Sequence, residues 1–178
     1  YKQSDYDIAL KSDHTPITIA DRIAHNTIKR SLGATRIPIL SEEGRSMLYE
    51  ERCNWELFWL VDPLDGTVEF IKGNNEFTVN IALMLNNICI SAIVYVPYHH
   101  KMYIAERGFG AWVMYDVAPL EDAHYTYSDI HANIHQLPLE LAEHSNYRVA
   151  VSRSHQTSET HQHINSLRTE HPDLEIIE

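Results

Sequence analysis

The segment from residue 77 to residue 115 contains several short apolar runs separated by turns, and the first of them alternates apolar and other side chains with the period of two that is typical of half-buried strands. The first alternating run begins at Phe77 and ends at Leu85, where Asn86-Asn87 supplies the residues that a tight hairpin turn favours. Further apolar segments follow between Pro- or Gly-containing turns, at residues 88–96, 102–105 and 111–115. Because consecutive strands joined by short turns pair antiparallel, this segment predicts an antiparallel meander.

A helix is predicted ahead of the meander. Thr18 is a good N-cap residue, and Asp21 stands three positions later, which is the capping-box pattern with Asp in place of Glu. Apolar residues recur every fourth position from Ala20 to Leu32, and Gly33 then supplies a stop signal. The pattern therefore predicts one amphipathic helix of about four turns.

Two short apolar runs lie between this helix and the meander. The run Ile37–Leu40 stops at Ser41-Glu42-Glu43, and the run Leu57–Val61 stops at Asp62. We interpret both as buried strands whose ends deliver carboxylates to the molecular surface.

The last third of the chain changes character. Residues 116–146 hold no clean period, and we predict irregular structure with a domain boundary there. A strand is then expected at 148–152, a helix at 157–168 and a further strand at 174–177. We therefore predict an N-terminal α+β metal-binding domain over residues 1–146 and the start of a truncated C-terminal α/β domain over residues 147–178.

Charge excludes several classes of function. The chain has 14 Lys and Arg against 25 Asp and Glu, so its net charge of −11 repels nucleic-acid backbones and anionic lipid surfaces. No apolar run approaches the roughly 20 residues that a membrane-spanning helix needs. Cys53 and Cys89 form no CxxC pair, which favours a reducing cytoplasm over a disulfide framework. If such an acidic chain acts on an anionic substrate, we expect metal cations or a local concentration of a few donor groups to offset the repulsion.

The strongest chemical signal is the segment Asp62-Pro63-Leu64-Asp65-Gly66-Thr67. Two carboxylates three residues apart on a tight turn can converge on one point, while the amides of Gly66 and Thr67 stay free. Hard oxygen ligands suit Mg²⁺, and free amides at the start of a helix suit a phosphate group. The alternative is an Asx-type turn in which both carboxylates only cap the backbone. The further acidic positions at Asp21 and Glu42 favour the metal site.

These motifs carry a resemblance to a known family. Residues 62–67, together with the segments 16–21 and 41–43, resemble the inositol monophosphatase superfamily of Mg²⁺-dependent, lithium-sensitive phosphomonoesterases. Within it, residues 65–72, 75–83 and 151–155 most resemble the CysQ-type 3'(2'),5'-bisphosphate nucleotidases of sulfur metabolism, which convert adenosine 3',5'-bisphosphate to AMP and phosphate. The resemblance implies an α+β fold, a layered αβαβα sandwich of the sugar-phosphatase type whose C-terminal part lies outside this chain.

The resemblance also implies a catalytic site with about two or three Mg²⁺ ions. The implied metal ligands are Glu42, Asp62, the Leu64 carbonyl and Asp65, with Glu43 as the substitute for Glu42. The implied substrate-binding residues are Glu42, Leu64, Asp65, Gly66 and Thr67. The implied catalytic residues are Thr67, Asp21 and Glu42. In this pattern the Gly66 and Thr67 amides hold phosphate oxygens, and the Thr67 hydroxyl, oriented by Asp21, activates the attacking water.

The chain departs from the nucleotidase pattern at two places. Val68 stands where CysQ-type enzymes usually carry a basic residue, which removes a partner for a second phosphate. The family's later Trp-Asp motif, which completes the second metal site, is expected beyond Glu178, and the family's first helix is expected ahead of Tyr1.

Three other functions stay open. The first is inositol monophosphatase or sugar-bisphosphatase activity within the same superfamily. The second is a haloacid dehalogenase type of phosphatase, although its two Asp are separated by one residue, whereas Asp62 and Asp65 are separated by Pro63 and Leu64. The third is a non-catalytic fragment that binds a metal or ligand.

The expected partners are few. We expect a small-molecule phosphoester as substrate, a homodimer as the assembly to test, and neither nucleic acid nor a transmembrane segment. The cytoplasm is the expected location, and peripheral association with the inner membrane is implied by the resemblance alone.

Overall fold

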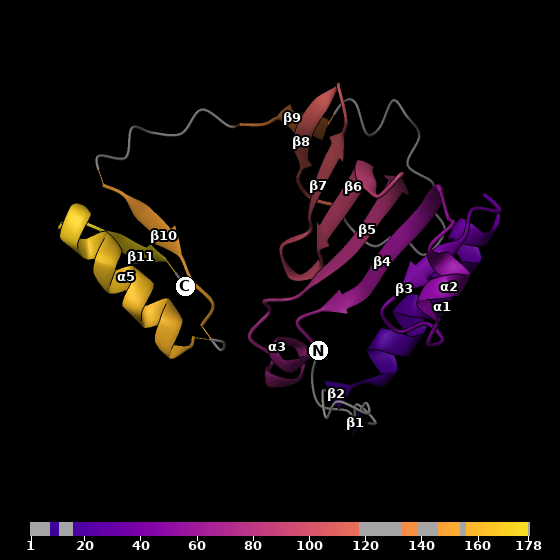
Figure 1. Cartoon of the computed structure of the whole chain (residues 1–178), viewed down its shortest axis with the longest axis horizontal. Coiled ribbons are helices and arrows are strands. Elements are labelled where there is room, and N and C mark those ends of the chain that lie inside the picture. Colours follow the sequence, from indigo (N-terminus) through magenta and orange to yellow (C-terminus); the bar gives the residue numbers. More distant parts are fainter. Residues whose placement is uncertain (1–7, 11–15, 118–132, 139–145, 154–155, 178) are drawn as a thin grey trace. The chain divides into compact units, whose positions relative to one another are not determined.

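The computed structural model describes residues 8–10, 16–117, 133–138, 146–153 and 156–177. The chain divides into two compact units, Tyr1–Leu139 and Glu140–Glu178 (Figure 1). The domain boundary expected from the sequence at residues 146–147 stays a prediction.

The first unit is built on a seven-stranded sheet with the order β3-β4-β5-β6-β7-β8-β9 (Figure 1). β3 and β4 are parallel, and each of the other neighbouring pairs is antiparallel. The strands are β3 (Ile39–Ser41), β4 (Leu57–Asp65), β5 (Thr78–Leu85), β6 (Ile88–Val96), β7 (Lys101–Glu106), β8 (Gly110–Met114) and β9 (Ile134–Gln136).

The predicted meander is confirmed in β5 to β8. Asn86 and Asn87, which join β5 to β6, both have positive φ angles, 49° and 61°, as a two-residue hairpin turn of the favoured hand requires. A 3-10 turn at Pro97–His99 joins β6 to β7. The prediction of irregular structure throughout residues 116–146 was wrong at β9, because a three-residue strand is too short to show a period and exists through its pairing with β8.

The predicted N-terminal helix is confirmed as α1 (Ile19–Gly33). Thr18 is its N-cap, and the capping box with Asp21 is complete. α1 packs against β4 and β3, where Val61 is 3% exposed and belongs to the core. The helix therefore covers one face of the sheet beside these two strands (Figure 1).

The strand predicted to stop at Val61 is longer in the structure. β4 continues to Asp65 because Asp62 and Asp65 still pair with β5, across an irregularity between them. The helix expected after this segment is confirmed as α3 (Thr67–Lys72).

Three further elements had no clear signal in the sequence. They are β1 (Ala9–Leu10), β2 (Pro16–Ile17), which pairs with it antiparallel, and α2 (Tyr49–Arg52). All three are four residues long or shorter, which is less than periodicity can detect. The polar segment from Lys11 to Pro16 predicts a loop; Pro16 instead belongs to β2, and residues 11–15 lie outside the described residues.

The second unit follows the predicted order of elements. β10 (Arg148–Ala150) and β11 (Glu175–Ile177) are parallel, and α5 (Ser158–Glu170), capped by Thr157, connects them. Parallel neighbours joined through a helix form a β-α-β unit. Within the described parts of the chain, no helix is both long and apolar enough to span a bilayer.

Candidate active site

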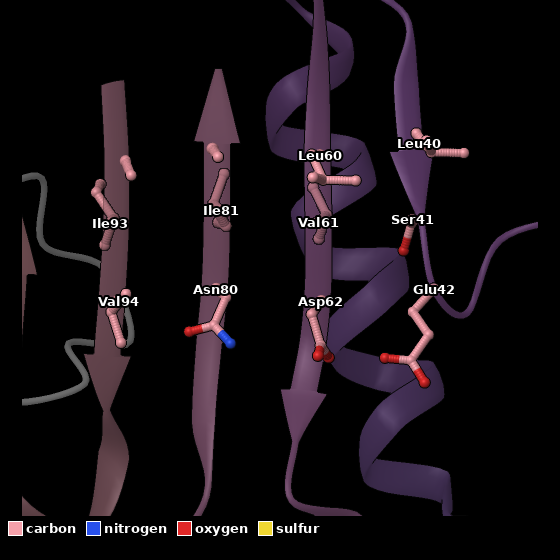
Figure 2. Close-up of a pocket in the computed structure, with 12 residues that line it drawn as sticks. Leu40, Ser41, Glu42, Leu60, Val61, Asp62, Asn80, Ile81, Ile93 and Val94 are labelled. Atoms are coloured by element: carbon pink, nitrogen blue, oxygen red, sulfur yellow. The ribbon is translucent and has the colours of Figure 1, made fainter. Parts of the chain in front are cut away.

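The carboxylates of Glu42 and Asp62 meet where β3 and β4 end. Within the part of the chain that the structure describes, these two strands are the only parallel pair of the seven-stranded sheet. β3 ends at Ser41 beside Val61 of β4, and the Glu42 amide donates to the Val61 carbonyl at 3.0 Å. Glu42 therefore lies next to Asp62, and Figure 2 shows its carboxylate directed towards Asp62. Since parallel strands end at the same edge of a sheet, the pairing itself brings these two predicted ligands together.

A β-bulge brings Asp65 to the same side. Asp62 is opposite Asn80 and Asp65 is opposite Thr78, so β4 has one more residue than β5 between these two pairs. In a regular strand, residues three apart point to opposite faces, and the extra residue cancels this change of face. Asp62 and Asp65 consequently share the face that carries Asn80 and Thr78.

This arrangement perturbs the ionisation of Asp62. Burial is the largest cause, and together with the negative charges of Glu42 and Asp65 it raises the pKa of the half-buried Asp62 from 3.8 to about 7. A hydrogen bond between the Asp62 and Glu42 carboxyl groups favours the protonated form of Asp62, whereas the Leu64 amide, which donates to Asp62 Oδ1 at 3.2 Å, opposes the shift. The cluster repels itself unless a proton or a cation neutralises it.

The donor chemistry fits a hard cation. Carboxylate and carbonyl oxygens are the ligands that Mg²⁺ prefers, and the acidic cluster offers no nitrogen or sulfur ligand. Among the described residues, no group of three or more His, Cys, Asp or Glu side chains has the arrangement of a ready-made metal site.

The predicted catalytic pair is in contact. The Thr67 hydroxyl donates to Asp21 Oδ1 at 3.0 Å, and it also lies 3.3 Å from the Leu64 carbonyl oxygen. Asp21 is fully buried, and its other oxygen accepts hydrogen bonds from the Thr18 amide, at 2.7 Å, and from the Thr18 hydroxyl. The capping box of α1 thus holds the Asp21 carboxylate in place for Thr67.

The turn at Gly66 requires glycine. Its φ of +94° lies in the left-handed region, and a Cβ there would lie 2.7 Å from the Glu76 carbonyl oxygen. Gly66 begins α3, and among the described residues neither its amide nor that of Thr67 donates to a protein acceptor. Both predicted phosphate-binding amides are therefore available to a ligand.

A groove of about 470 Å³ adjoins the acidic cluster on the strands β3 to β6. Its polar end contains Glu42, Asp62 and Asn80, which lie side by side in Figure 2, with α1 behind the strands. The remainder of its lining is largely apolar, and includes Leu40, Leu60, Ile81, Ala82, Ala92, Ile93 and Val94.

The structure adds two polar contacts that the sequence did not indicate. Asn80 Nδ2 donates to Asp65 Oδ2 at 3.2 Å, and His25 Nδ1 lies 2.8 Å from the Ser41 hydroxyl oxygen, next to Glu42. Neither Asn80 nor His25 belongs to the three acidic motifs of the sequence. Glu43, the substitute ligand, follows Glu42 in a turn closed by a hydrogen bond from Gly44 to Ser41.

The sequence profile of the inositol monophosphatase family matches residues 1–173. The chain belongs to the inositol monophosphatase family. This confirms the resemblance that the three acidic motifs carry.

Relatives within the family are similar over part of their length. The 3'(2'),5'-bisphosphate nucleotidase CysQ of Buchnera aphidicola subsp. Acyrthosiphon pisum is 41% identical over 140 residues, which cover 74% of this chain and 52% of the relative. CysQ of Shigella flexneri is 49% identical over 108 residues, which cover 60% of this chain and 43% of the relative. The chain spans about half the length of the curated relatives it matches.

A solved structure shows the same fold. The crystal structure of CysQ from Bacteroides thetaiotaomicron, a bacterial member of the inositol monophosphatase family, superposes with a TM-score of 0.86 at 41% identity. The match covers 99% of this chain and 64% of that one. The predicted α+β fold class is confirmed.

Proposed function

We propose that the complete gene product is a Mg²⁺-dependent phosphomonoesterase that removes the 3'-phosphate of adenosine 3',5'-bisphosphate and releases AMP and phosphate. The observation that carries the proposal is the Thr67–Asp21 hydrogen bond beside the Glu42–Asp62 pair. Thr67 and Asp21 can accept a proton from water, and the two carboxylates of the pair can bind a cation. Identities of 41% and 49% to enzymes named as 3'(2'),5'-bisphosphate nucleotidases support this choice of substrate.

The acidic cluster would hold the metal. Glu42, Asp62 and the Leu64 carbonyl are the proposed ligands of one Mg²⁺ ion, and Asp62 and Asp65 those of a second. Bound Mg²⁺ lowers the pKa of water and neutralises charge on the phosphate. The carboxylates would hold the positive charge of the metal at the ends of β3 and β4.

Thr67 and Asp21 would activate the attacking water. The Thr67 hydroxyl directs its own proton to Asp21, so an oxygen lone pair of Thr67 is left to accept a hydrogen bond from water. Asp21 is held by the Thr18 backbone and side chain, and this rigid support keeps the direction of the hydroxyl constant. The water would then attack phosphorus in line with the leaving oxygen.

The start of α3 would bind the phosphate. The amides of Gly66 and Thr67 have no protein acceptor among the described residues, and the left-handed backbone at Gly66 lets both face one anion. Val68 adds no positive charge here, so the second phosphate of the substrate needs a partner elsewhere in the complete protein.

Phosphate release by the complete gene product tests the proposal. It should be measured on adenosine 3',5'-bisphosphate and on inositol 1-phosphate side by side, with Mg²⁺ and with a chelator. Mg²⁺-dependent release that favours the nucleotide is the expected result. Preference for the inositol ester would replace the substrate but keep the site, and no release from either ester would refute the assignment.

The homodimer and the cytoplasmic location stay predictions. Sedimentation of the complete protein tests the first, and fractionation of cells tests the second.

A further inference from the structure

Asn80 is the polar residue of the groove that no motif in the sequence singled out. It lies in β5 directly opposite Asp62, on the face that the bulge also gives to Asp65. Its side chain is half-buried, and its amide nitrogen donates to Asp65 Oδ2 at 3.2 Å. Asn80 therefore adjoins both Asp62 and Asp65 of β4.

Asp65 has few other constraints. It is solvent-exposed, and in the part of the chain that the structure describes Asn80 is the one side chain that donates a hydrogen bond to it. A carboxylate with no such partner samples several rotamers, and ordering it costs free energy when a cation binds. The Asn80 amide removes part of that cost before binding.

The chemistry of the donor matters as much as its position. An amide is neutral, so it orients Asp65 without cancelling the negative charge that attracts a cation. A Lys or Arg in its place would form an ion pair and compete with the metal. The bond occupies one oxygen of Asp65 and leaves the other for a ligand, which is the usual role of a residue that supports a metal ligand.

We propose that Asn80 is a positioning residue that holds the Asp65 carboxylate so that Asp65 and Asp62 bind one cation together. This inference rests on the proposed function for the reaction it serves, but metal binding can be measured without any substrate. Asn80 belongs neither to the metal ligands nor to the catalytic pair.

The test compares two variants of the complete gene product on the same strand. Asn80→Val removes the amide and keeps a residue that strands favour, whereas Thr78→Val makes a similar change opposite Asp65 and leaves the amide in place. Mg²⁺ affinity is measured by titration calorimetry, and the Mg²⁺ concentration for half-maximal activity is measured in parallel. We expect Asn80→Val to weaken Mg²⁺ binding by about 10- to 100-fold and Thr78→Val to change it less than about two-fold.

A merely structural role for Asn80 predicts a different result. In that case Asn80→Val lowers the melting temperature but leaves the Mg²⁺ affinity of the folded protein within about two-fold of wild type, and the proposal is wrong. Equal weakening by Thr78→Val would also overturn it. Asn80→Thr, which keeps a polar side chain too short to reach Asp65, decides the question if Asn80→Val does not fold.

The substrate assay separates this inference from the proposed function. A wild-type protein that binds Mg²⁺ but releases no phosphate would refute the function, while the calorimetric comparison of the variants would still test Asn80. A wild-type protein that binds no Mg²⁺ would refute both.

Discussion

Replacing Asp62 by Asn should make the metal-free protein more stable while it abolishes activity. Asn has nearly the shape of a protonated Asp and can donate to the Glu42 carboxylate as the protonated acid does. It never acquires the charge that Glu42 and Asp65 repel. The variant therefore keeps the favourable contacts of Asp62 at every pH and avoids the repulsion.

The size and the sign of the effect follow from the pKa of Asp62. A rise from 3.8 to about 7 corresponds to about 4 kcal/mol, and screening by solvent at a half-exposed carboxylate reduces this to about 2 kcal/mol. The folded protein binds the proton more tightly than the unfolded chain does. This stabilisation is complete below the pKa of Asp62 in the unfolded chain, and it is lost as the pH rises through the folded-state pKa of about 7.

Wild type loses that stabilisation between about pH 4 and pH 8, and Asp62→Asn does not. The stability of the variant relative to wild type should therefore increase by about 2 kcal/mol over this range, or about 4 to 8 °C in melting temperature. Thermal melts of both proteins with a chelator, at several pH values, measure the difference. Adding Mg²⁺ at pH 8 should raise the melting temperature of wild type far more than that of the variant.

A control and an activity assay complete the experiment. Asp173→Asn makes the same chemical change at an exposed carboxylate in the second unit and should change the melting temperature much less than Asp62→Asn does. Phosphate release by Asp62→Asn should fall below detection because a proposed metal ligand is gone. A stability difference for Asp62→Asn that stays flat or shrinks as the pH rises would refute the electrostatic reasoning, and a wild-type rate of release would refute the metal assignment.

Three further substitutions test the frame of the site. Gly66→Ala should lower the free energy of unfolding by about 1 to 3 kcal/mol in urea titrations, because it forces a Cβ into a left-handed position 2.7 Å from a backbone carbonyl oxygen; an unchanged midpoint would contradict this. Thr67→Val removes the hydroxyl that bonds to Asp21 and should lower kcat by about 100- to 10,000-fold, whereas Thr67→Ser keeps most of the rate; equal rates for the two variants would exclude a role for the hydroxyl. The amide of a Gln side chain takes the place of the imidazole Nε2, so His25→Gln loses the contact with Ser41 and should lower the free energy of unfolding by about 1 kcal/mol in thermal melts. The amide of Asn takes the place of Nδ1, which makes that contact, so His25→Asn should lower the stability less. The reverse order would show that the contact does not stabilise the fold.

Local patterns were enough to predict most of the elements. The meander, the Asn86-Asn87 turn and the capped helix α1 follow from side-chain period, turn chemistry and capping, which act over a few neighbouring residues. Family membership also follows from short segments, because the residues of each acidic motif are contiguous in the chain. The sequence did not predict the strand β9, because three residues show no period and its partner β8 is distant in the sequence.

The sequence by itself thus determined which acidic residues this protein presents, and in which segments. Only the tertiary structure decided how they meet. The parallel pairing of β3 with β4 places Glu42 beside Asp62, and the bulge in β4 turns Asp65 to the face of Asp62 and Asn80. Spacing along a chain counts residues, but it does not reveal where a strand carries an extra one or which distant strand lies next to it. The raised pKa of Asp62 has the same origin, because burial and neighbouring charge exist only after these strands have come together.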